Sequence, residues 1–101
     1  MALDLFEETL ALVRALDAAG VDYAVAGAIA LAIHGAPRAT ADIDLLIVPT
    51  DLAGGLQVAE QRGFRFSALP MRFAAGMEIR RVSKIEGEET LTLDFLLVNE
   101  N

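Results

Sequence analysis

Two aspartates, Asp42 and Asp44, stand two residues apart at the start of the aliphatic run that ends at Val48. This run predicts a central strand covered on both faces, in which alternate side chains share a face, so both carboxylates point the same way. Two ionised carboxylates beside an apolar interior repel and need a cation, and Mg²⁺ prefers oxygen ligands. An aspartate at a strand start also serves as a turn or cap residue, and the doublet alone leaves both roles open.

A third aspartate, Asp94, has a similar setting. In the predicted strand over 90–98, Asp94 and Thr92 share one face, and leucines and a phenylalanine share the other. If this strand neighbours that of the doublet, Asp94 joins the site as a third carboxylate. If it does not, Asp94 lies on a solvated face.

A stretch before the doublet offers contacts for a phosphate. Gly27 ends an apolar run and opens a predicted helix, where backbone N–H groups and the helix dipole can hold an anion. A glycine there also suits a plain strand-to-helix turn. Arg38 can neutralise a phosphate or pair with a surface acid, and Thr40 can act as a ligand or stabilise a turn.

The apolar pattern predicts the elements that must position these residues. Apolar residues recur at three- and four-residue steps over 3–16, which predicts an amphipathic helix closed by Gly20. The pattern then predicts a buried strand over 21–26, a short helix over 28–34, a central strand over 42–48, a helix from Thr50 or Asp51 to about Arg62, a short strand over 64–67, and a hairpin of strands 77–85 and 90–98. The order α-β-α-β-α-β-β-β indicates the α/β (α+β) class, a small mixed sheet packed by helices. On the hairpin, we expect Arg80, Arg81 and Lys84 to lie on a solvated face.

The residues from His34 to Leu45 read HGxPRxTxDIDL, and they follow a glycine at a predicted strand end. With the later aspartate, this pattern resembles the polymerase beta-type nucleotidyltransferase superfamily, closest to the small bacterial branch with abortive-infection and toxin–antitoxin nucleotidyltransferases. The resemblance covers Val21 to about Val98. It implies a nucleotidyltransferase-like core that transfers a nucleoside monophosphate from an NTP to a hydroxyl, with two Mg²⁺ ions, or Mn²⁺ in their place.

The resemblance also implies a role for individual residues. Asp42 and Asp44 match the metal-binding and catalytic doublet, and Asp94 matches the third acid. Gly27 matches the first residue of the family's phosphate turn, and Arg38, before the doublet, matches a basic position in this branch. Where the family usually has Ser or Gly next, this chain has Ala28, which keeps the backbone N–H but supplies no hydroxyl.

The resemblance leaves the acceptor and the activity open. The acceptor could be a protein hydroxyl, a transfer RNA end or a small molecule. The alternative to an active enzyme is a weak or inactive relative that serves as an interaction module, for example in a toxin–antitoxin pair.

Length and composition limit the number of domains and indicate an assembly. The 101 residues allow one domain, over 1–101. Hydrophobic residues make up 54% of the chain, more than a small monomer needs, so we expect a homodimer or a tight complex with a partner protein. The aliphatic face of the last strand should need cover, from another chain or from a C-terminal segment that this sequence lacks.

Charge and cysteine content exclude several classes. The 15 acidic and 8 basic residues give a net charge of −7, which excludes a general nucleic-acid surface. The chain has no cysteine, so thiolate metal sites and thiol nucleophiles are excluded and a reducing compartment is favoured. The longest apolar run, 23–33, is shorter than the ~20 residues of a membrane span, and no basic signal region begins the chain. We therefore expect a cytoplasmic protein.

Overall fold

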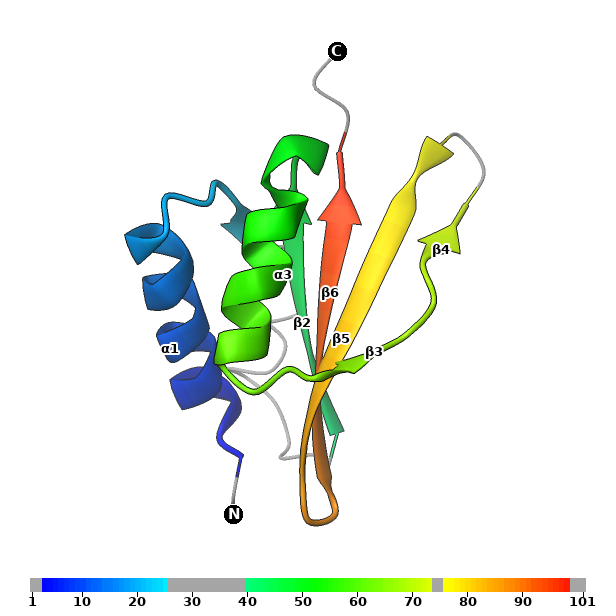
Figure 1. The fold of residues 1–101 in the computed structure, drawn as a ribbon. Helices are drawn as coiled ribbons and strands as arrows, with labels where there is room; N and C mark the ends of the chain where they lie inside the picture. The colour runs from blue at the N-terminus through cyan, green and yellow to red at the C-terminus, as the bar shows by residue number, and fades with distance from the viewer. Residues whose placement is uncertain (1–2, 26–39, 74–75, 99–101) are drawn as a thin grey trace.

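The computed structural model describes residues 3–25, 40–73 and 76–98. These residues form two helices, one short 3-10 turn and a six-stranded sheet (Figure 1). The predicted α+β class, with a small mixed sheet packed by helices, is confirmed. The helix predicted over 28–34 lies outside the described residues.

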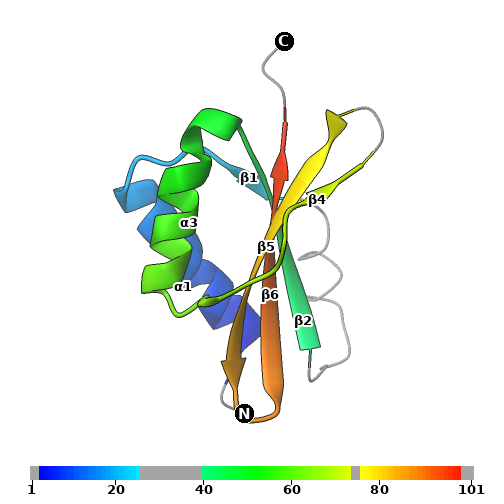
Figure 2. The ribbon, with the colours of Figure 1, turned by 45° about the vertical axis from the view of Figure 1, so that its right-hand side comes forward.

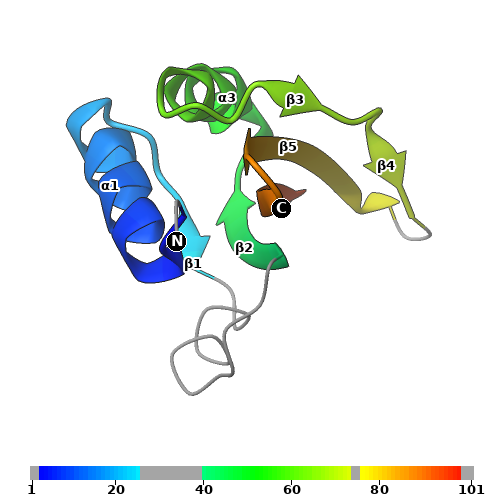
Figure 3. The ribbon, with the colours of Figure 1, turned by 90° about the horizontal axis from the view of Figure 1, so that it is seen from below.

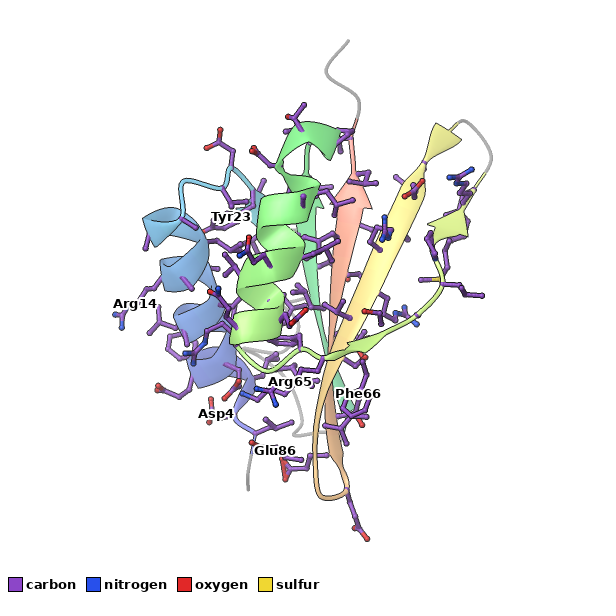
Figure 4. All side chains as sticks on the ribbon, in the orientation of Figure 1. Asp4, Arg14, Tyr23, Arg65, Phe66 and Glu86 are labelled. Atoms are coloured by element: carbon purple, nitrogen blue, oxygen red, sulfur yellow. The ribbon has the colours of Figure 1, made fainter. Side chains whose placement is uncertain are left out.

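Helix α1 (Leu5–Ala18) confirms the first predicted element. Asp4 caps it, because its side chain accepts a hydrogen bond from the Glu7 backbone N–H at 2.9 Å. Leu12 and Leu16 are fully buried, whereas Arg14 points away from the sheet on the outer side of the helix (Figure 4). The helix therefore has the apolar and polar faces that its sequence spacing predicts.

The strands of the sheet are, in chain order, β1 (Ala24–Val25), β2 (Thr40–Ile47), β3 (Phe66–Ser67), β4 (Met71–Arg72), β5 (Glu78–Glu86) and β6 (Glu89–Leu97). Their spatial order is β1-β2-β6-β5-β3, and β4 also pairs with β5. The central pair, β2 and β6, is parallel, and the other pairs are antiparallel. β4 is an addition to the predicted order, because two residues are too few to carry a periodic pattern.

Both helices lie on one side of the sheet (Figures 2 and 3). Six of the side chains that β2 and β6 direct to this side are exposed by 1% or less; they are Ile43, Leu45, Ile47, Leu91, Leu93 and Phe95. Helix α3 (Leu52–Gln61) comes so close that a Cβ on Gly55 would lie 3.0 Å from Ile47 Cδ1. The core is therefore a single layer between the two helices and the central strands.

Two contacts attach α1 to the hairpin. Lys84 Nζ lies 2.6 Å from Glu8 Oε1, and these side chains are only 16% and 20% exposed. The Leu3 backbone N–H donates to Glu89 Oε1 at 2.9 Å. The expectation of a solvated Lys84 was therefore wrong, because the strand alternation turns this residue toward the helices.

Three other expectations need correction. The strand predicted over 21–26 is only two residues long and exposed, because β1 lies at the sheet edge and Val21 reaches the core from the preceding loop. β2 is fully buried on one face only, since Asp42 is exposed and Asp44 is half-buried. Neither Thr50 nor Asp51 caps α3 with its side chain; a 3-10 turn, η1 (Pro49–Asp51), leads into that helix.

The last strand does not lack cover. β6 lies between β2 and β5, and residues 91–95 are all buried. Large apolar side chains are exposed instead around β3 and β4, at Phe66, Leu69, Phe73 and Met77. In the part of the chain that the structure describes, no helix is both long and apolar enough to cross a membrane.

Candidate active site on the open face of the sheet

The three aspartates meet on the face of the sheet opposite α1 and α3. The parallel register of β2 and β6 sets Asp42 beside Thr92 and Asp44 beside Asp94. Neighbouring strands lie about 4.8 Å apart, and paired residues share a face. Of the two alternatives that the sequence leaves open for Asp94, the structure shows the one in which its strand neighbours that of the doublet.

β5 adds a cation to this face. Its antiparallel register with β6 sets Arg81 opposite Asp94 and Ser83 opposite Thr92. Arg81 Nε donates to Asp94 Oδ1 at 2.8 Å, and Arg81 Nη2 donates to Asp94 Oδ2 at 3.0 Å. Such a bidentate contact fits the planar guanidinium group and is stronger than one hydrogen bond.

The expectation that Arg81 lies on a solvated face is confirmed, since its side chain is 44% exposed. Its two hydrogen bonds to Asp94 were not predicted. Its neighbour Arg80 alternates to the other face of β5, where its Nη1 lies 3.8 Å from Glu78 Oε2. Only one of the two consecutive arginines thus belongs to the site.

Burial differs along the acidic row. Asp94 is 7% exposed, Asp44 is half-buried and Asp42 is exposed. Burial raises the pKa of Asp44 above its ordinary value of 3.8, and the charges of Asp94 and Asp42 raise it further, while Arg81 opposes the rise. Removing a proton from Asp44 therefore leaves a charge that its surroundings do not fully compensate.

The donor types suit a divalent cation. Carboxylate oxygens are the ligands that Mg²⁺ and Mn²⁺ prefer, and three carboxylates on one face supply the charge. Within residues 3–25, 40–73 and 76–98, however, no three His, Asp or Glu side chains are placed to share one ion. Both oxygens of Asp94 already accept hydrogen bonds from Arg81. The residues thus fit an ion by donor type and by shared face, but the described geometry does not bring the three carboxylates around one ion, and Arg81 lies on the third.

Most of the predicted phosphate contacts fall outside the part of the chain that the structure describes. Gly27, Ala28 and Arg38 lie outside the described residues. Thr40 is the first residue of β2. The expected phosphate turn and basic position therefore stay predictions.

The hairpin sequence contains a signal for the pairing of Arg81 with Asp94, namely the position of its turn. β5 ends at Glu86 and β6 begins at Glu89, so the turn consists of Gly87, with a φ of +59°, and the residue after it. Glycine at the start of a two-residue turn is typical of tight hairpins. Counting outward from this turn pairs Arg81 with Asp94, and the alternation then places both on one face.

The chain matches no family model, no curated protein and no solved structure with which it was compared. Function is therefore inferred from the residues of this face and from the sequence pattern.

Proposed function

We propose that this chain is a nucleotidyltransferase domain that depends on a divalent metal. It would transfer a nucleoside monophosphate from an NTP to a hydroxyl acceptor. The observation that supports this most is the common face of Asp42, Asp44 and Asp94, set by the parallel register of β2 and β6. The sequence pattern from His34 to Leu45 adds the family resemblance.

In the proposed reaction, the acceptor oxygen forms a bond to the α-phosphorus as the bond to the pyrophosphate oxygen breaks. Bound Mg²⁺ would neutralise charge on the attacking and leaving oxygens. Asp42 and Asp44 would hold the ion with Asp94. Asp94 would also accept the proton of the hydroxyl, which requires that Arg81 release at least one of its oxygens.

The raised pKa of Asp44 also supports a cation site. A carboxylate with two acidic neighbours and partial burial is destabilised when ionised. A divalent cation removes this repulsion, so metal binding should be favoured most when Asp44 is charged.

A calorimetric titration with Mg²⁺ and a nonhydrolysable NTP tests the proposal. Wild type should bind both, and Asp44→Asn should lose most of the metal affinity. Glu60→Gln is a matched control, because it removes one negative charge from an exposed position on α3, and it should bind like wild type. Equal affinities of wild type and Asp44→Asn would refute the metal site.

One observation favours a second candidate, a relative of the same fold that binds partners and transfers no nucleotide. The Arg81 guanidinium already neutralises Asp94 without a metal. In that case neither Mg²⁺ nor an NTP should bind at millimolar concentration. The domain would then act through its surface, as a homodimer or within a toxin–antitoxin pair, which sedimentation with and without a candidate partner measures.

A further inference from the structure

We propose that Arg81 competes with the divalent cation for Asp94. In the metal-free protein the guanidinium occupies both oxygens of this carboxylate, and metal binding displaces it. The proposal rests on the proposed function, since it presupposes a metal at the three aspartates. It adds the residue that sets how tightly the ion binds.

The first support is the geometry of the pair. The two bonds, 2.8 and 3.0 Å long, engage one donor with each oxygen of Asp94. A guanidinium in this arrangement takes the in-plane lone pairs that a metal ion would use. Full use of the Asp94 carboxylate by an ion therefore requires that at least one of these bonds break.

The second support is the distribution of charge. The Arg81 guanidinium contacts Asp94, which is the register partner of Asp44 on the neighbouring strand. The other described cations of β5 face the opposite way, with Arg80 near Glu78 and Lys84 on Glu8. Arg81 therefore supplies the positive charge that Asp94 contacts.

The third support is that Arg81 has room to leave. Its side chain is 44% exposed, whereas that of Asp94 is 10% exposed. β5 is held by its backbone ladders to β6, β3 and β4, so the side chain can rotate toward solvent while the strand stays in place. The exchange then moves a side chain and leaves the fold unchanged.

Metal affinity of the full chain tests the proposal, with Mn²⁺ followed by electron paramagnetic resonance and Mg²⁺ by calorimetry. Arg81→Gln should bind either ion about tenfold more tightly than wild type, because the ion no longer has to break two charge-assisted hydrogen bonds. Arg80→Gln is the matched control. It removes the same charge from the adjacent residue of β5, on the other face, and should change the affinity less than twofold.

The outcomes separate this proposal from the proposed function. If wild type binds metal, Asp44→Asn loses it and Arg81→Gln binds equally or more weakly, the competition is refuted while the metal site stands. If Arg81→Gln binds metal where wild type binds none, the competition is supported. If neither protein binds metal, both the competition and the metal site are refuted.

Removal of any positive charge would tighten metal binding somewhat, so a second measurement detects the displacement itself. In the nuclear magnetic resonance spectrum of wild type, the Arg81 Nε–H signal, assigned by its loss in Arg81→Lys, should shift as Mg²⁺ saturates the site. The Arg80 signal should stay in place. An unmoved Arg81 signal at saturation refutes the displacement, and this readout holds even if Arg81→Gln fails to fold.

Discussion

Replacing Asp44 by asparagine should stabilise the metal-free protein at neutral pH. Asp44 and Asp94 are register partners on neighbouring strands. Two unit charges about 4.8 Å apart repel by about 3.5 kcal/mol at an effective dielectric constant near 20. The bidentate Arg81 offsets most of this, and Asp44 is only half-buried. A net gain of about 1 kcal/mol is therefore expected for Asp44→Asn.

The pH dependence of stability independently checks whether Asp44→Asn stabilises or destabilises the fold. The pKa of Asp44 is raised in the folded protein, so above the ordinary value of 3.8 the folded state holds more protons than the unfolded state. The contribution of Asp44 to the stability of wild type must then fall as pH rises from that value through the folded pKa. The advantage of Asp44→Asn should be largest near pH 7 and vanish near pH 3.5.

Urea unfolding in EDTA at pH 7 and at pH 3.5 measures this difference. Asp22→Asn, an exposed loop position, is the control and should change stability by less than about 0.5 kcal/mol. Loss of stability in Asp44→Asn at pH 7, or an advantage that is equal at both pH values, would refute the electrostatic reasoning. Saturating Mg²⁺ should reverse the order, because an ion at 100 times its Kd stabilises the folded wild type by about 2.7 kcal/mol.

Three further predictions concern the packing and the expected phosphate turn. Lys84→Met should destabilise the fold by about 1 to 3 kcal/mol in urea, because it leaves Glu8 without its 2.6 Å partner; unchanged stability would mean that water replaces this contact. Gly55→Ala should lower the Tm, since the new Cβ meets Ile47 at 3.0 Å and Phe95 at 3.3 Å, and a higher Tm would show that the better helix propensity of alanine dominates. Ala28→Ser should tighten NTP binding with Mg²⁺ about tenfold, because a hydroxyl restores a hydrogen bond to a phosphate. If neither Ala28→Ser nor wild type binds an NTP in calorimetry, the enzyme proposal should be dropped.

Sequence patterns predicted the long elements, because each extends over many residues. Apolar spacing predicts the helix Leu5–Ala18, and two β-rich segments on either side of a glycine-containing turn predict the strands of the hairpin. Among the short strands, β1 and β3 lie within the strands predicted over 21–26 and 64–67, but their two-residue lengths were not predicted, and β4 was missed, since such short strands are defined by their neighbours in the sheet. A local pattern holds no information about such pairing.

The candidate site was predicted only in part, because some of its residues come together through pairing between strands. Alternation along one strand sufficed to place Asp42 and Asp44 on a common face, but whether Asp94 joins them depends on which strands are adjacent. The exposure of Arg81 was predicted from its charge and its place on a hairpin, but its pairing with Asp94 was not, because the register across the turn decides which acid it meets. Tertiary pairing thus creates contacts that residue type alone does not predict.

The parallel pairing of β2 with β6 has a consequence for the folding rate. It joins segments separated by about half of the chain, and closing so long a loop costs entropy before any contact is formed. The same step brings Asp44 against Asp94, so like charges approach while the central ladder closes. We expect this pairing to be the slow step in refolding, so that the aspartates already approach each other in the transition state. Stopped-flow refolding of Asp44→Asn should then be faster than that of wild type, and equal rates would show that the aspartates meet only after the rate-limiting barrier.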